Sequence, residues 1–213
     1  MFHLSTRRFV PAVAALLAAI VLLTVPSAEA MKLKTQNLTQ LISASESIIF
    51  GTVKSVTDGI DERGVPYTEI TIAVGSSAKG NVADETDYTF RQFGLLEPRA
   101  MDNGHQLVAV TPDGFSRWRK GETVVAFLYK PAALTGLQTT AGMAQGKLTL
   151  INGSLMNEFN NAGLFEGVEI DSDLTTPEEQ TMLTTPGAVD AQTFMGLVQR
   201  AVEEGWIENG GMR

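Results

Sequence analysis

The chain has 213 residues, no cysteine and a formal net charge of −8 at pH 7. This length suits one domain with a real hydrophobic core, and a chain without cysteine can form neither a disulfide nor a thiolate metal site. The region from Glu158 to Arg213 contains 11 acidic and two basic residues. Such a surface repels phosphate backbones and anionic lipid, so neither nucleic acid nor a membrane surface is expected as a partner.

Residues 1–30 have the pattern of a signal peptide. Arg7 and Arg8 form its positive start, and Ala28-Glu29-Ala30 matches a cleavage site. The apolar run between them is about 16 residues, whereas a bilayer span needs roughly 20. We therefore predict an exported product, periplasmic or extracellular, that begins at Met31 and is not stably inserted in a membrane. The arginine pair leaves both the general secretory route and the twin-arginine route open.

Residues 31–151 are predicted to form a β domain. A capping box at Asn37-Leu38-Thr39-Gln40 indicates a short helix that ends near Ser45. Alternating apolar residues then predict strands over residues 47–57, 67–74, 88–93, 106–111 and 123–129. We expect a loop over residues 75–87 and a closing hairpin formed by residues 137–144 and 147–151. Gly51 within the first strand indicates a bulge or a sharp bend.

The remaining residues divide into a loop and a helix. Residues 152–188 are rich in Asn, Asp and Thr, which predicts a long acidic and polar surface loop. Within residues 189–213, Asp190 is expected to cap a helix that runs to about Glu204. An apolar stripe predicts that this helix packs on the β domain: Phe194, Leu197, Val198, Ala201 and Val202.

Several motifs between Leu38 and Ile151 form a familiar series: Ser45 with Ile48-Ile49-Phe50-Gly51, Thr68 with Ile70, Ile72 and Val74, Lys79-Gly80, Gly121-Glu122 before Val124-Val125 and Phe127-Leu128, and Ala144-Gln145-Gly146-Lys147. In these motifs the chain resembles a group of uncharacterised exported bacterial proteins that have small OB-type (NTR-like) β-barrels. The resemblance implies a mainly β fold: a small antiparallel OB-like barrel with a short N-terminal helix and a C-terminal helix packed on it. The motifs are structural, so they imply no catalytic activity.

The candidate ligand or partner surface consists of Arg117, Trp118, Arg119 and Lys120. One interpretation is a solvated turn at Lys120-Gly121, in which Glu122 pairs with Arg119 or Lys120. The cations would then guard the following strand against edge aggregation, and Trp118 would seal one end of the barrel. The other interpretation is a platform on which a Trp face beside cations binds an anion or a sugar.

The sequence offers little for catalysis or metal binding. His105 is the only histidine after the signal segment, and no G-x-S-x-G elbow presents a serine to it. Glu169, Asp171 and Asp173 alternate as calcium ligands do, but Leu174 stands where an EF-hand loop needs Gly. A solvated acidic loop is the simpler interpretation, and a looser calcium loop stays open. We predict no enzyme, no catalytic or metal-binding residue and no cofactor.

The function that these features favour is an exported, non-catalytic binding or structural module of the cell exterior. The alternative is a partner or inhibitor of a secreted enzyme such as a metalloprotease, because tissue inhibitors of metalloproteases also use an OB-type barrel. Those inhibitors chelate the metal with an N-terminal Cys, whereas the predicted N-terminus here is Met31. A secreted or periplasmic protein is the expected partner.

Overall fold

A computed structural model describes residues 34–108 and 110–213, so the predicted signal segment lies outside the described residues. This part of the chain is mainly β. Its helices are α2 (Leu38–Ala44), α3 (Pro177–Thr184), α4 (Ala191–Glu203) and the short 3-10 helix η2 (Met143–Gly146). Its strands are β1 (Ser47–Ile60), β2 (Pro66–Lys79), β3 (Asp87–Phe93), β4 (Arg99–Ala100), β5 (Gln106–Leu107), β6 (Thr123–Leu128), β7 (Lys147–Ile151), β8 (Ser154–Met156) and β9 (Val189–Asp190).

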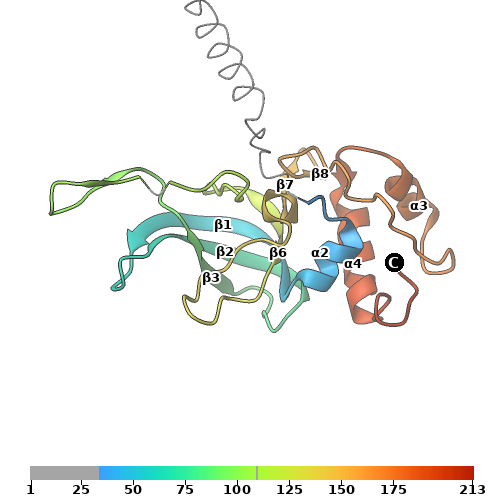
Figure 1. The fold of residues 1–213 in the computed structure, drawn as a ribbon. Coiled ribbons are helices and arrows are strands. Elements are labelled where there is room, and N and C mark those ends of the chain that lie inside the picture. Colours follow the sequence, from blue (N-terminus) through green and yellow to red (C-terminus); the bar gives the residue numbers. More distant parts are fainter. Residues whose placement is uncertain (1–33, 109) are drawn as a thin grey trace, which may run out of the picture. The chain divides into compact units, whose positions relative to one another are not determined.

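Seven of the strands form one antiparallel sheet in the order β3-β2-β1-β6-β7-β8-β9, and β4 and β5 form a separate hairpin. Helices α2, α3 and α4 gather at one end of this sheet (Figure 1). Among the described residues the strand pairings leave β3 and β9 as edges and do not close into a barrel. The mainly antiparallel β fold predicted from the sequence is confirmed at this level.

Strands β1 and β2 form a hairpin that is longer than predicted. Each has 14 residues, and Ile48 is paired with Lys79. The predicted loop over residues 75–87 is therefore wrong for residues 75–79. Backbone pairing with β1 holds this polar segment extended. The predicted bulge at Gly51 is confirmed by a register shift between Phe50 and Gly51. A Cβ at Gly51 would lie 2.3 Å from the carbonyl oxygen of Ala73, so only glycine fits there.

Strand β6 is central and is buried on both faces. Alternate side chains face opposite sides of a strand, and here each side has its own hydrophobic cluster. Val125 and Phe127 pack with α2 and α4. The other face contributes to a cluster enclosed by β1, β2, β3 and β6, whose members are Ile49, Val53, Ile70, Ile72, Val74, Phe90, Trp118, Val124, Ala126 and Leu128. This double burial explains why the β6 sequence is apolar at nearly every position.

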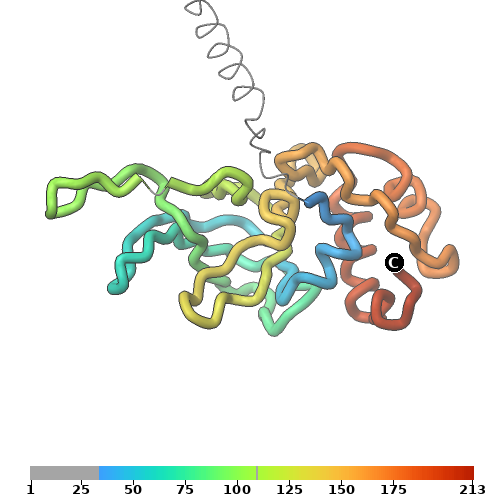
Figure 2. The backbone as a smooth tube through the Cα atoms, viewed as in Figure 1, coloured from blue at the N-terminus to red at the C-terminus, as the bar shows by residue number. Residues whose placement is uncertain are grey.

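The fourth predicted strand, residues 106–111, is largely wrong. Among the described residues of this segment, Gln106 and Leu107 pair with Ala100 and Arg99, and Val110 forms an isolated bridge to Leu95. Residues 94–108 and 110–112 instead form an arm that extends away from the main sheet, with the β4–β5 hairpin in it (Figure 2). We call this segment the arm. Leu95 at its base is buried, whereas Leu96, Met101, Val108 and Val110 are exposed, so the local β pattern does not extend into the main sheet.

The predicted hairpin about Gln145-Gly146 is also wrong in its first half. Residues 137–141 run along the end of β6 instead, where Ala141 N–H donates to the Phe127 carbonyl (2.7 Å) and Tyr129 N–H donates to the Thr139 carbonyl (3.0 Å). Helix η2 then leads directly into β7. Gly146 permits this path, because a Cβ there would lie 2.0 Å from the Ala141 carbonyl oxygen. The second half of the hairpin, β7, is confirmed.

Residues 152–188 are more ordered than the predicted loop. They contain β8, which continues the sheet beyond Ile151, and α3, which begins with a capping box between Thr176 and Glu179. The boundary placed after residue 151 is therefore not a break in the sheet. Helix α4 is confirmed: the Asp190 side chain accepts from Thr193 N–H, and its apolar stripe is buried in the same cluster as β6.

Candidate functional site

The predicted turn at Lys120-Gly121 is confirmed. Gly121 has φ +89°, which favours glycine, and its N–H donates to the Val53 carbonyl at 2.8 Å. Glu122 N–H donates to the Arg119 carbonyl at 3.3 Å, which closes the turn. The interpretation of these cations as guards of a sheet edge is wrong, because β6 lies between β1 and β7.

The residues before this turn alternate between the core and the solvent. Ser116 and Trp118 are buried, whereas Arg117, Arg119 and Lys120 are exposed. This is the period of an extended chain, in which side chains two positions apart face the same side. The fold thus presents Arg117 and Arg119 together and uses Trp118 for packing.

Trp118 is part of the core and is only 7 % exposed. Its ring meets Phe90 edge-on, with 5.4 Å between ring centroids, and Lys147 Nζ lies 5.2 Å from the indole. The indole Nε1 donates to Gln92 Oε1 at 3.3 Å. A flat ligand has little free indole face to stack on, so the sugar platform is not supported and Trp118 seals this end of the cluster.

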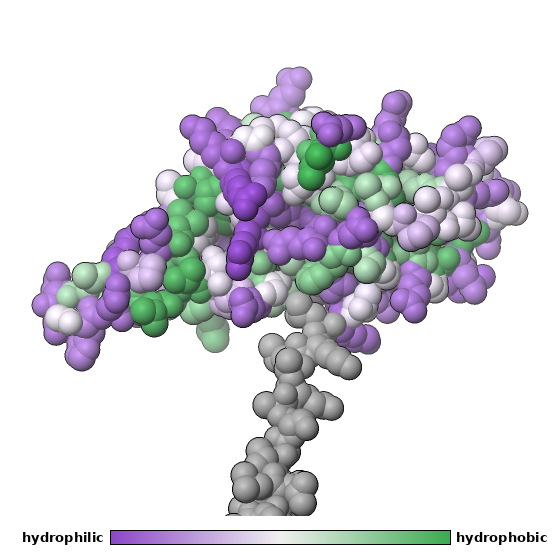
Figure 3. Space-filling view, turned by 90° about the horizontal axis from the view of Figure 1, so that it is seen from above, coloured by the Kyte–Doolittle hydropathy of each residue, from purple (hydrophilic) through white to green (hydrophobic). Residues whose placement is uncertain are grey.

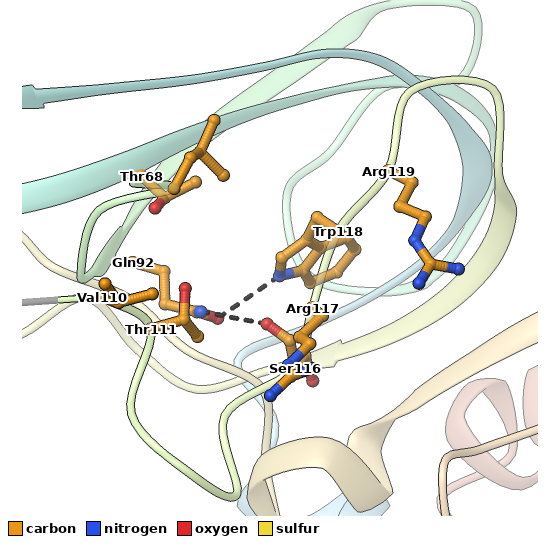
Figure 4. A pocket seen from close by; sticks show the side chains of 9 residues that line it. Thr68, Gln92, Val110, Thr111, Ser116, Arg117, Trp118 and Arg119 are labelled. Atoms are coloured by element: carbon orange, nitrogen blue, oxygen red, sulfur yellow. Dashed lines mark hydrogen bonds between the residues drawn. The ribbon is translucent and has the colours of Figure 1, made fainter. Parts of the chain in front are cut away.

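A buried polar network holds the segment in place (Figure 4). Gln92 Nε2 donates to the Ser116 carbonyl at 3.0 Å, and Ser116 Oγ lies 2.8 Å from Thr140 Oγ1. Gln92, Ser116 and Thr140 are all at most 1 % exposed. Because buried polar groups are costly to leave unpaired, the network gives residues 116–118 one stable conformation.

Glu122 does not form the predicted ion pair with the Arg119 or Lys120 side chain, although its Oε2 accepts from the Arg119 backbone N–H at 3.2 Å. Its Oε2 accepts from the ammonium of Lys147 at 2.6 Å, and the same ammonium donates to the Arg117 carbonyl at 2.6 Å. The Lys147 side chain is 6 % exposed and that of Glu122 is 18 % exposed. Glu122 therefore forms its ion pair with a buried cation and none with the surface cations.

A cavity of about 350 Å³ lies beside this segment. Three of the four predicted residues contribute to it, and Lys120 does not. The lining comprises Thr68, Gln92, Leu96, Val110, Thr111, Ser116, Arg117, Trp118 and Arg119. We call it the Trp118 pocket. Figure 4 shows that its walls come from separate parts of the chain, with Thr68 and Gln92 on strands β2 and β3.

The Trp118 pocket has a one-sided charge. Its lining includes two arginines and no Asp, Glu or His. None of the ion pairs found in the described part of the chain includes Arg117, Arg119 or Lys120. Arg117 and Arg119 also line a second cavity of about 330 Å³, together with Lys147, Glu122 and Glu158. Arg117 and Arg119 thus line both cavities, and only the second also has carboxylates in its lining.

The other residues considered from sequence do not form a site. His105 is exposed on the arm. Glu169 forms an ion pair with Arg213 at 3.7 Å. Within residues 34–108 and 110–213, no group of three or more His, Asp or Glu side chains is arranged to hold a metal ion.

Sequence reasoning missed six residues of the pocket: Thr68, Gln92, Leu96, Val110, Thr111 and Ser116. One signal was available. Gln92 lies two positions after Phe90, so both side chains are expected on the same, buried face of the strand. Thr68 and Ser116 lie two positions from the buried Ile70 and Trp118, which is the same kind of signal. Leu96, Val110 and Thr111 could not be placed, because the path of the arm was not predicted.

Comparison of the chain with protein-family models, with curated proteins and with solved structures finds no match. In the part of the chain that the structure describes, no helix combines the length and the apolar character needed to cross a membrane.

Proposed function

We propose that the chain is an exported, non-catalytic binding module of the cell exterior and that the Trp118 pocket is its ligand site. One observation carries this proposal. The same pocket has a hydrogen-bonded floor and two arginines that form no ion pair among the described residues. A mostly pre-formed cavity with a few converging polar groups is typical of a small-molecule site.

An OB-like barrel is the scaffold that we propose for this module. Two observations support it. Strands β1, β2, β3 and β6 share one enclosed hydrophobic cluster. In addition, Gln138 N–H donates to the Arg91 carbonyl at 2.7 Å, which joins the free edge of β3 to the segment that runs along β6. Together these contacts curl the sheet toward the ring of a small barrel.

The choice of binding over catalysis rests on the chemistry of the pocket lining. General acid–base catalysis uses groups such as His, Asp, Glu, Lys, Tyr or Cys near the reacting atoms, and the polar lining here consists of hydroxyl, amide, indole and guanidinium groups. These groups orient a ligand and donate hydrogen bonds. Export is supported by the signal-peptide pattern of residues 1–30.

A fragment screen tests the proposal with residues 31–213 labelled with ¹⁵N. The readout is the indole N–H resonance of Trp118, with that of Trp206 as an internal control. We expect some fragments to move the Trp118 resonance. In Val110→Trp the new ring should fill the cavity, since Val110 lines the Trp118 pocket, and these shifts should disappear. The matched control is Val108→Trp, because Val108 is 69 % exposed on the arm and does not line the pocket. A screen with no pocket-dependent fragment contradicts the proposal.

The second candidate function is a protein partner or inhibitor of a secreted enzyme. One observation favours it: the arm carries exposed apolar side chains, among them Met101 and Val108, which are 38 % and 69 % exposed. Figure 3 shows hydrophobic side chains along the arm at the left. The double variant Met101→Ser/Val108→Ser distinguishes the two functions. It should abolish capture of a secreted protein if the arm is the interface, and it should leave fragment binding unchanged if the pocket is the site.

A further inference from the structure

The two walls of the Trp118 pocket differ in chemistry. One wall carries Arg117 and Arg119, and the other carries Leu96 and Val110, which are 46 % and 41 % exposed. Leu96 and Val110 belong to the arm, and Leu95 and Val110 form a β-bridge at its base. The arm therefore places an apolar surface across the cavity from the two cations.

The two arginines are spaced to act together. They are two positions apart on an extended segment and on the same face of it, so their Cβ atoms are about 7 Å apart. A guanidinium group donates paired hydrogen bonds to a carboxylate or a similar oxyanion, and such charge-assisted bonds are stronger than neutral ones. An oxyanion that reaches both side chains receives donors from both.

No carboxylate lines the Trp118 pocket, although Glu122 and Glu158 line the second cavity that Arg117 and Arg119 also border. Lys147 contributes little net charge because Glu122 binds its ammonium. Glu122 itself does not line the Trp118 pocket, nor does Glu158, the other carboxylate close to Arg117. The floor is held by Gln92 and Ser116, so binding an anion there requires little reorganisation, which lowers its cost.

We propose that the Trp118 pocket binds a small organic anion. Its carboxylate or similar oxyanion contacts Arg117 and Arg119, and its compact apolar body packs against Leu96 and Val110. This inference rests on the proposed function, since it names the ligand class of the same pocket. A sugar is disfavoured by the covered face of Trp118, and an inorganic anion would leave the apolar wall in water.

Four probes separate the parts of this proposal. They are phenylacetate, its neutral isostere phenylacetamide, acetate, and inorganic phosphate. Each is titrated into residues 31–213 while the Trp118 and Trp206 indole N–H resonances are followed. We expect phenylacetate to move the Trp118 resonance with a Kd at least about tenfold lower than those of the other three, since losing either one charge contact or the apolar body costs roughly this factor.

Variants of the same segment assign the contact. Arg117→Gln and Arg119→Gln should each raise the Kd for phenylacetate by about tenfold. Lys120→Gln is the matched control, because Lys120 is an exposed cation of the same segment outside the pocket lining, and it should change the Kd by less than about twofold. An unchanged Trp206 resonance in each variant shows that the fold is intact.

Several results overturn the inference. Equal affinity for phenylacetamide and phenylacetate excludes an anion site, and equal affinity for phosphate excludes the apolar contact. Insensitivity to Arg117→Gln and Arg119→Gln places the anion elsewhere, and no shift with phenylacetate at millimolar concentrations rejects the ligand class. The fragment screen tests the proposed function separately. A neutral fragment whose shift of the Trp118 resonance disappears in Val110→Trp still identifies the Trp118 pocket as a site.

Discussion

At the scale of single residues, the contact between Lys147 and Glu122 joins three parts of the chain. Lys147 opens β7, Glu122 precedes β6, and the Lys147 ammonium also binds the Arg117 carbonyl. A buried cation is tolerated only when its charge and its hydrogen bonds are satisfied. The pair therefore supports the conformation of the segment that carries the candidate site.

We expect Glu122→Gln to lower the free energy of unfolding by about 3 kcal/mol, because it leaves a buried ammonium without a counter-charge. Urea denaturation followed by circular dichroism measures this change. The matched control is Asp87→Asn, since the Lys54–Asp87 pair has the same 2.6 Å separation but side chains that are 53 % and 49 % exposed. Its effect should stay below about 1 kcal/mol. Similar losses in both variants would mean that Lys147 is solvated.

Asp190 gives a prediction for pH. The backbone N–H of Thr193, followed by its hydroxyl, donates to the Asp190 carboxylate and lowers its pKa from the ordinary 3.8. A group with a depressed folded-state pKa stabilises the fold above its unfolded-state pKa, and this contribution is lost as the pH falls through the folded-state value. Asp190→Asn keeps a capping oxygen but does not titrate.

The melting temperature of the wild-type chain relative to Asp190→Asn should therefore fall as the pH is lowered from about 5 to about 2. Asp190→Ala removes the cap altogether and should cost about 1 kcal/mol at neutral pH. Thermal melts of the three proteins across this range measure both effects. A difference between wild type and Asp190→Asn that does not depend on pH would show that this carboxylate is not held by the helix N-terminus.

At the scale of elements, α4 covers one face of the β6 region. Phe194 is fully buried, and its ring meets that of Phe127 at 72° with 6.4 Å between centroids. The side chain of Arg200, on the same helix, binds Glu179 of α3 and the Leu174 carbonyl. Helix α4 therefore links the sheet to residues 152–188, the segment that was predicted from the sequence to be a loop.

We expect Phe194→Ala to lower the free energy of unfolding by about 3–4 kcal/mol, because it removes buried apolar surface and leaves a cavity between α4 and β6. Gln192→Ala is the control, since Gln192 is exposed on the same helix, and it should change stability by no more than about 0.5 kcal/mol. Chemical denaturation measures both variants. Equal stabilities would show that α4 does not pack on the sheet.

At the scale of the whole molecule, export is a prediction from residues 1–30 alone. Expression of the full chain in a host with a secretory pathway should yield a product that begins at Met31, and N-terminal sequencing of the fraction outside the cytoplasm checks this. Ala30→Arg alters the small-residue site and should block cleavage. A wild-type product that begins at Met1 and sediments with membranes would contradict the prediction.

Sequence reasoning succeeded where the decisive interactions are local. The capping box of Asn37 and Gln40, the Gly51 bulge and the Asp190 cap are all present. It failed for residues 137–144, where a plausible hairpin partner lay next in sequence. That segment is hydrogen-bonded to β6 and β3 instead, and a choice between two pairings of similar local quality depends on long-range packing.

The sequence by itself determined the mainly β class, the central position of β6 and the amphipathic C-terminal helix, because apolar periodicity reports which side of an element is buried. It also marked Arg117, Trp118 and Arg119 as a group. Only the tertiary structure decided what each of them does. Burial of Trp118 against Phe90 depends on β3, pairing of Glu122 with Lys147 depends on β7, and the apolar wall opposite the two arginines depends on the arm. These partners are far apart along the chain, so no local pattern specifies their contacts.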